Sequence, residues 1–150
     1  MHRLYENEEI TVFWDSEKCR HEKKCVTGSP QVFEFGRRPW IDLKRGETAK
    51  IWQTVSSCPS GAVSIVYNHD VTLRLEEEGG RCLALQGDTV IGECDFADEG
   101  DCRNIYHTEV SPEHGGKGIA KRLVYKVTEA GERKGKKIIP ICSYAAKVLG

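Results

Sequence analysis

Three cysteines in the N-terminal part of the chain constrain its fold more than any other feature. Five residues separate Cys19 from Cys25, and Cys58 follows much later, directly before Pro59. Thiolates hold iron–sulfur clusters, and the cysteine run of bacterial clusters ends in a Cys-Pro step. The spacing does not fit a zinc ribbon built from two close cysteine pairs. We therefore expect these three thiolates to converge on one metal centre.

The fourth ligand depends on the kind of centre. A 3Fe–4S cluster needs three ligands, whereas a 4Fe–4S cluster needs a fourth, for which His21 is the nearest candidate. The same four side chains could instead bind zinc as a Cys3His site, which carries no redox activity. A third alternative is that the three cysteines are buried thiols with a structural role.

The composition is that of a globular protein. Of 150 residues, 39% are hydrophobic and 30% are charged. Because no apolar run reaches membrane-spanning length and the N-terminus lacks the apolar core of a signal peptide, we expect a cytoplasmic protein with no membrane partner. The seven cysteines then predict metal ligands or free thiols rather than a disulfide framework.

The charges are strongly segregated along the second half of the chain. Nine acidic residues and one basic residue lie between Glu76 and Asp101, whereas eight basic and three acidic residues lie between Glu113 and Lys137. The basic stretch follows a glycine-rich segment, which favours a polyphosphate ligand. No aromatic interleaving or base-reading motif accompanies it, which disfavours nucleic acid as a partner.

Hydrophobic periodicity predicts an α+β chain with two domains, 1–68 and 69–150. Expected strands cover residues 10–14, 62–67, 71–75, 81–86, 89–94, 103–110 and 138–142, and expected helices cover 47–55 and 117–133.

A phosphate site is predicted at the segment from His114 to Ala120. Gly116 and Gly118 let the backbone approach a ligand closely, and the following helix directs its first N–H groups toward it. Lys117, Lys121 and Arg122 could then reach the outer phosphates. The alternative is a basic helix face that is merely solvated.

The N-terminal half resembles the divergent single-cluster ferredoxin domain from about residue 5 to residue 67. The matching segments are Cys19–Cys25, Val32–Phe33, Arg38–Ile41 and Cys58–Ala62. The resemblance implies a small ferredoxin-like domain with one 4Fe–4S or 3Fe–4S cluster, electron transfer or redox sensing, and a redox partner protein. It carries Cys19, Cys25 and Cys58 over as ligands, and His21 stands at a motif position.

The C-terminal half, from about residue 71, resembles the minimal members of the GNAT acetyltransferase superfamily. The matching segments are His107–Val110, Gly116–Ala120 and Pro140–Tyr144. The resemblance implies a mixed α/β domain that binds acetyl-CoA and acetylates an amine. The implied binding residues are Val110, Gly116, Lys117, Gly118, Ile119, Ala120 and Lys121. Gly115 stands where the family has Gln or Arg, which removes one side chain from the phosphate site.

Three residues are candidates for the chemistry. Glu109 could act as a base toward the amine, Cys142 could accept the acetyl group in a ping-pong route, and Tyr144 could protonate the leaving thiolate. Each has a structural alternative, namely a surface carboxylate, a core thiol and a packed aromatic ring. Because Gly150 follows soon after Tyr144, we expect little of the helix that usually continues a GNAT domain.

The leading hypothesis is an iron–sulfur protein with N-acetyltransferase activity that redox state regulates. One alternative is a non-catalytic electron carrier or redox sensor whose second half only binds CoA. The other is a zinc-stapled interaction module.

Overall fold

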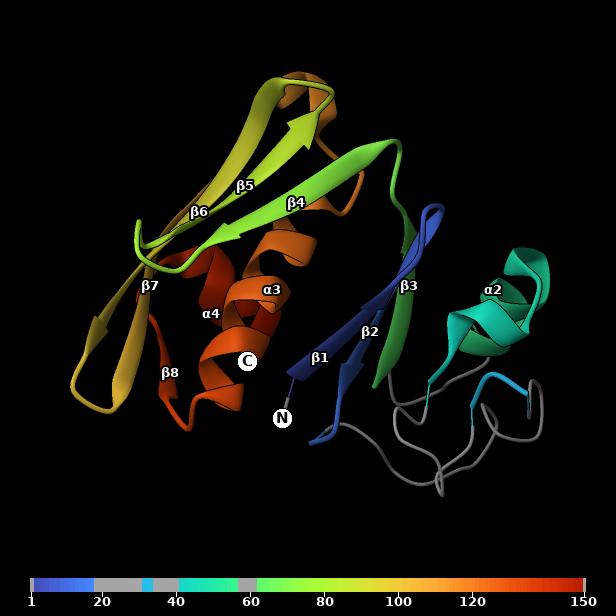
Figure 1. Cartoon of the computed structure of the whole chain (residues 1–150), viewed down its shortest axis with the longest axis horizontal. Coiled ribbons are helices and arrows are strands. Elements are labelled where there is room, and N and C mark those ends of the chain that lie inside the picture. The colour runs from blue at the N-terminus through green and yellow to red at the C-terminus, as the bar shows by residue number, and fades with distance from the viewer. Residues whose placement is uncertain (1, 18–30, 34–40, 57–61, 150) are drawn as a thin grey trace. The chain divides into compact units, whose positions relative to one another are not determined.

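The computed structural model describes residues 2–17, 31–33, 41–56 and 62–149. Apart from the first two residues, the chain divides into two compact units, Arg3–Tyr67 and Asn68–Gly150. Each unit has its own sheet (Figure 1). Each also has its own hydrophobic core. The α+β class predicted from the sequence is confirmed.

The N-terminal unit contains a three-stranded sheet in the order β1-β2-β3. Its strands are β1 (His2–Glu6), β2 (Ile10–Asp15) and β3 (Val63–Tyr67). β2 and β3 are antiparallel, with Ile10 opposite Tyr67 and Trp14 opposite Val63. β1 was not predicted, because Leu4 and Tyr5 are its only apolar residues.

Two short helices contribute to the same unit, namely η1 (Leu43–Arg45) and α2 (Thr48–Ser56). α2 contacts β3 and buries Ile51 and Val55, which are four residues apart and so share one helix face. Its Trp52 ring stacks on Tyr67, with 4.5 Å between the ring centroids. The core of the unit comprises Ile10, Val12, Val32, Phe33, Ile41, Leu43, Ile51, Val55 and Val63.

The C-terminal unit contains a five-stranded sheet in the order β4-β5-β6-β7-β8. The strands are β4 (Val71–Glu76), β5 (Arg81–Gln86), β6 (Thr89–Glu99), β7 (Cys102–Val110) and β8 (Lys137–Pro140). Neighbouring strands are antiparallel except β7 and β8, which are parallel. A short helix, η2 (Pro112–His114), follows β7.

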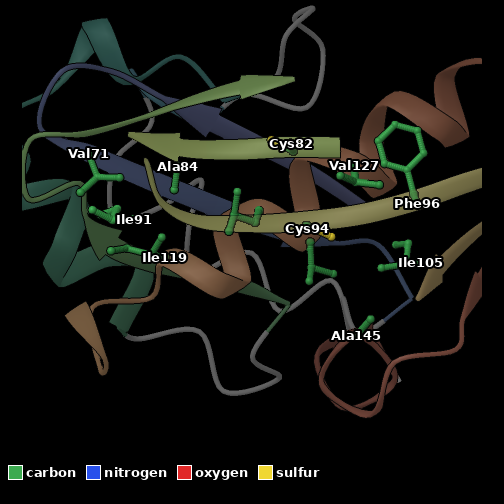
Figure 2. Close-up of a cluster of buried hydrophobic side chains, with 12 residues drawn as sticks. Val71, Cys82, Ala84, Ile91, Cys94, Phe96, Ile105, Ile119, Val127 and Ala145 are labelled. Atoms are coloured by element: carbon green, nitrogen blue, oxygen red, sulfur yellow. The ribbon is translucent and has the colours of Figure 1, made fainter. Parts of the chain in front are cut away.

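Two helices, α3 (Ile119–Arg133) and α4 (Ser143–Leu149), pack on one face of this sheet (Figure 1). Figure 2 shows buried side chains between the strands and the helices. The cluster comprises Val71, Cys82, Ala84, Ile91, Cys94, Phe96, Ile105, Ile119, Leu123, Val124, Val127 and Ala145. This apolar layer fixes where the residues at the ends of β7, α3 and β8 lie.

A β-bulge in β7 decides which of its side chains face the helices. Asp95 lies opposite His107, but the next residue, Phe96, lies opposite Ile105, so Tyr106 is one extra residue in β7. Bulges redirect the side chains that follow them. As a result residues 105 and 108 face the helices, whereas 107 and 109 face the opposite side of the sheet.

Three element boundaries differ from the prediction by two residues or more, namely the start of α3 and the ends of β6 and β8. α3 begins at Ile119 rather than at residue 117, because Gly118 adopts a left-handed conformation with φ of 74°. β6 continues to Glu99 and Cys102 begins β7, so Cys102 is a strand residue rather than a loop residue. β8 ends at Pro140, because the chain then turns into α4.

Within the described ranges, no helix combines the length and apolarity needed to cross a membrane.

Candidate functional site

The predicted metal ligands Cys19, His21, Cys25 and Cys58 lie outside the described residues. Elsewhere in the chain, the described residues contain no group of three or more His, Cys, Asp or Glu side chains that could hold a metal ion. Three thiolates with one imidazole form a soft donor set, which suits an iron–sulfur cluster or zinc. These four ligands therefore stay a prediction from the sequence.

The candidate acetyl-CoA site begins where β8 ends. The parallel pairing of β7 with β8 runs from Cys102 opposite Lys137 to Ile105 opposite Pro140. The N–H groups of residues 141 and 142 both donate to the carbonyl oxygen of Ile105, which turns the chain into α4. β7 continues to Val110 with β6 as its partner. Beyond Ile105, the side of β7 away from β6 is therefore an edge that an extended ligand could join.

The glycine-rich turn follows directly after this edge. Gly116 and Gly118 have φ of 78° and 74°, in the left-handed region that favours glycine. A Cβ built on Gly116 would have no heavy atom within 4 Å among those compared, so the turn faces open space. The first intrahelical bond of α3 runs from the N–H of Arg122 to the carbonyl of Gly118. The N–H groups of residues 119–121 precede it and have no acceptor within the helix.

The basic side chains at the start of α3 differ in their contacts and in their burial. The Lys117 ammonium lies 3.5 Å from Nδ1 of His114, and the Lys121 ammonium lies 5.7 Å from the centre of the Tyr125 ring. Arg122 is 1% exposed, and its guanidinium donates to the carbonyl of Asn68 at 3.4 Å. The prediction that Arg122 could reach the outer phosphates is therefore wrong.

Cys142 lies at the junction of β8 and α4, beside β7. Its thiol donates to the Thr108 hydroxyl at 3.6 Å, and the Ala145 N–H donates to its sulfur at 3.3 Å. The Thr108 hydroxyl in turn donates to the sulfur of Cys94, also at 3.6 Å. Burial raises the pKa of the Cys94 thiol to about 12. Sequence reasoning missed Thr108 and gave Cys94 no role.

Tyr144 lies two residues after Cys142, in the first turn of α4. It is half-buried, and this burial, together with the neighbouring Cys142, raises the pKa of its phenol above the ordinary value. A phenol with a raised pKa keeps its proton throughout the neutral range. Tyr144 is therefore a proton donor in its resting state.

Glu109 lies on the opposite face of β7 from Thr108. Its carboxylate is 68% exposed and lies 3.3 Å from Nε2 of His107, on the same face of the strand. Glu93 of β6 stands directly opposite Glu109 in the register. A hydrogen bond with Asp95, together with burial and the charges of Asp95 and Glu109, raises the pKa of Glu93.

A groove of about 340 Å³ adjoins these two carboxylates. Its lining comprises Val90, Ile91, Gly92, Glu93, Glu109, Ser111 and Pro112. Gly92 allows β6 and β7 to approach closely here, because a Cβ at this position would lie 2.9 Å from the carbonyl oxygen of Glu109. Sequence reasoning missed Glu93, although the alternation of β6 with its register against β7 would have identified it.

Two family models match the chain. Residues 5–68 match the family described as a divergent 4Fe-4S mono-cluster, and residues 82–150 match the family described as GCN5-related N-acetyl-transferase. The uncharacterized protein YjdI of Escherichia coli is 34% identical over 68 residues, which cover 45% of this chain and 87% of YjdI. YjdI of a second Escherichia coli strain matches equally.

A solved structure is also similar. The crystal structure of a GCN5-related N-acetyltransferase from Sphaerobacter thermophilus is 18% identical, with a TM-score of 0.41, over 90% of this chain. The alignment covers 36% of that protein, so this chain spans about a third of its length. The two resemblances stated from the sequence are confirmed by the two family matches. This chain belongs to the divergent 4Fe-4S mono-cluster family through its N-terminal half, and residues 82–150 match the GCN5-related N-acetyl-transferase family model.

Proposed function

We propose that this protein is an acetyl-CoA-dependent N-acetyltransferase that acts on an amine and carries one iron–sulfur cluster. The observation that carries the proposal is the position of the Cys142 thiol, 3.6 Å from Thr108 on the strand edge that leads into the glycine-rich turn. One ligand could therefore extend from the turn to this thiol.

The proposed substrate path follows the chemistry of CoA. The pyrophosphate binds the N–H groups of residues 116–121, where the left-handed glycines leave room and Lys117 and Lys121 add positive charge. The pantetheine arm, which contains amide groups, pairs with the backbone of β7 up to Val110. The acetyl thioester then lies near Cys142.

The proposed reaction has two steps. The Cys142 thiol first releases its proton to solvent; its Sγ then forms a bond to the acetyl carbon while the bond from that carbon to the CoA sulfur breaks, and Tyr144 gives its proton to the CoA thiolate. The amine nitrogen then attacks the acetyl carbon, the bond to Cys142 breaks and returns the Cys142 thiolate, and the amine proton passes to the Tyr144 oxygen. Glu109 faces the opposite side of β7, so the prediction that it acts as the base does not fit this arrangement. No electrons are exchanged in either step.

The cluster is proposed from the donor set of Cys19, Cys25 and Cys58, with His21 as the candidate fourth ligand of a 4Fe–4S centre. When bound, it would supply one-electron redox chemistry. A redox partner protein would then exchange electrons with it. Regulation of acetyl transfer by the cluster predicts different transfer rates in the oxidised and the reduced protein, and equal rates would remove this part of the proposal.

The test is covalent labelling with isotopically marked acetyl-CoA, followed by acid quenching and peptide mass spectrometry. We expect one acetyl group on Cys142, and no acetyl-protein in Cys142→Ala. Cys102→Ala is the matched control, because Cys102 is a similarly half-exposed thiol at the far end of β7 and should leave labelling unchanged.

CoA release with a panel of amines completes the test. Release above background that disappears in Cys142→Ala supports the two-step route. If CoA release persists in Cys142→Ala and no acetyl-protein forms, the amine attacks acetyl-CoA directly and the two-step route is wrong. Acetyl-CoA binding without release for any amine would favour the non-catalytic redox protein instead.

A further inference from the structure

Three side chains from different elements form a continuous line of hydrogen bonds in the C-terminal unit. They are Cys94 of β6, Thr108 of β7 and Cys142 before α4. Cys94 and Thr108 are direct partners in the β6–β7 register, so their side chains share the face of the sheet that the helices cover. The bulge at Tyr106 is what turns Thr108 toward this face.

The position of Thr108 between two sulfurs limits what its hydroxyl can do. A hydroxyl has one proton to donate and two lone pairs that accept. While Cys142 is a thiol, its proton points to Thr108, and the Thr108 proton points to Cys94. If Cys142 loses its proton, rotation of both groups reverses the line: Cys94 donates to Thr108, and Thr108 donates to the Cys142 sulfur.

The reversed line stabilises a thiolate at Cys142 with two donors. One is the Thr108 hydroxyl, and the other is the Ala145 N–H, 3.3 Å from the sulfur. Cys94 can supply the supporting proton because it is fully buried and stays a thiol, with a pKa of about 12. Among the residues that the structure describes, Cys142 contributes electrostatically to the raised pKa of Cys94 from β6 and of Tyr144 from α4. The charged pair His107 and Glu109 lies on the other face of β7.

We propose that Thr108 is a positioning residue for acetyl transfer: supported by Cys94, its hydroxyl orients the Cys142 thiol and stabilises the thiolate that attacks the thioester. The inference rests on the proposed function for its role in catalysis. The hydrogen-bond line itself can be tested without acetyl-CoA, so the two can fail separately.

The experiment measures the rate at which iodoacetamide alkylates Cys142 as a function of pH, read by peptide mass spectrometry on the whole chain. Thr108→Val keeps the branched shape but removes the hydroxyl. We expect the pH of half-maximal alkylation to rise by about one unit, and the rate at neutral pH to fall about tenfold, as loss of one hydrogen bond to a charged group implies.

Two further variants separate a specific effect from a general disturbance. Thr108→Ser retains the hydroxyl and should restore the profile to that of the unchanged protein. Cys94→Ala removes only the supporting donor. We therefore expect a smaller effect in the same direction, with the alkylation rate of Cys142 at neutral pH falling about threefold. Cys102, alkylated in the same samples, should keep its profile in every variant.

An unchanged Cys142 profile in folded Thr108→Val would overturn the proposal, and so would a profile in Thr108→Ser that is shifted as far as that of Thr108→Val. If Thr108→Val does not fold, Cys94→Ala decides, because an unshifted profile there excludes the supporting role. With acetyl-CoA added, Thr108→Val should slow acetylation of Cys142 about tenfold without weakening acetyl-CoA binding. If the alkylation profiles of Thr108→Val and Cys94→Ala shift as expected but Cys142 is never acetylated, the hydrogen-bond line is supported and the proposed function is rejected.

Discussion

Arg103 and Glu77 form a bidentate ion pair across the C-terminal unit, although they are 26 positions apart in the sequence. The two terminal nitrogens of the guanidinium lie 2.9 and 2.7 Å from the two carboxylate oxygens. Asp98 forms a second bidentate ion pair with the same guanidinium, in which Nε and Nη2 lie 2.8 and 3.1 Å from its two carboxylate oxygens. The Arg103 side chain is fully buried, lies over the Phe96 ring and also donates to the carbonyl of Val127. One cation therefore joins the turn after β4 to β6, β7 and α3.

Replacing Arg103 by Met should destabilise the C-terminal unit by about 3 kcal/mol, because it removes the buried guanidinium from Asp98 and from Glu77, which keeps only its ion pair with Lys134 at 2.7 Å. All three tryptophans, at positions 14, 40 and 52, belong to the other unit, so tryptophan fluorescence would not detect the loss. Hydrogen exchange of peptides from β6 and β7, followed by mass spectrometry, measures the opening free energy of the unit where the change is expected.

Arg81→Met is the matched control for that variant. Arg81 binds Glu76 at 2.7 Å, but its side chain is half-exposed, and ion pairs between exposed side chains contribute little. We expect hydrogen exchange in β6 and β7 to stay nearly unchanged. If exchange accelerates equally in both variants, the buried ion pairs of Arg103 contribute no more to stability than the exposed ion pair of Arg81.

The same ion pairs predict how stability depends on pH. The hydrogen bonds to Arg103 lower the pKa of Glu77 and of Asp98 below their ordinary values of 4.5 and 3.8. Because these pKa values are lower in the folded state, the contribution is fully present above the ordinary values and is lost as the pH falls through the lowered ones. The opening free energy of β6 and β7, obtained from exchange rates divided by the intrinsic amide rate at each pH, should therefore fall below about pH 4.5. In Arg103→Met this acid dependence should be much weaker, and an unaltered dependence would assign it to other carboxylates.

Much of this fold follows from local patterns in the sequence. The apolar residues of α3 recur at helical spacing, and the strands of the C-terminal unit alternate, so both kinds of element were predicted near their true bounds. β6 exceeded its prediction because pairing with β7 extends it through the polar residues Asp98 and Glu99. Tertiary pairing outweighed local propensity there.

The site was less predictable, because its geometry depends on one extra residue in β7. No sequence signal marks Tyr106 as a bulge, yet the bulge decides that Thr108, and not His107, meets Cys142. The burial of Arg122 likewise depends on tertiary packing and not on a local sequence pattern. Its charge predicted a solvent-exposed helix face, whereas the packing of α3 encloses it.

The predicted cluster can be tested by substituting one ligand. Cys58→Ser should abolish the broad absorbance near ~400 nm of anaerobically purified protein and lower the bound iron and sulfide, because serine does not replace the thiolate. Cys102→Ser, at the start of β7 in the other half of the chain, should leave the absorbance unchanged. If the unsubstituted protein is colourless and contains zinc, the iron–sulfur hypothesis is wrong and the zinc-stapled module is favoured.

The glycine-rich turn offers a comparison between two glycines with the same local geometry. Gly116 and Gly87 have φ of 78° and 62°, and a Cβ at either position would have no heavy atom within 4 Å among those compared. Alanine at either position should cost about 1 kcal/mol of backbone strain, so the two variants should lose similar stability. Only Gly116→Ala adds a methyl group where the pyrophosphate is proposed to approach. It should weaken acetyl-CoA binding about tenfold in calorimetric titration, which is about 1.4 kcal/mol, whereas Gly87→Ala should bind as the unchanged protein does. Equal affinities in the two variants would place the pyrophosphate away from this turn.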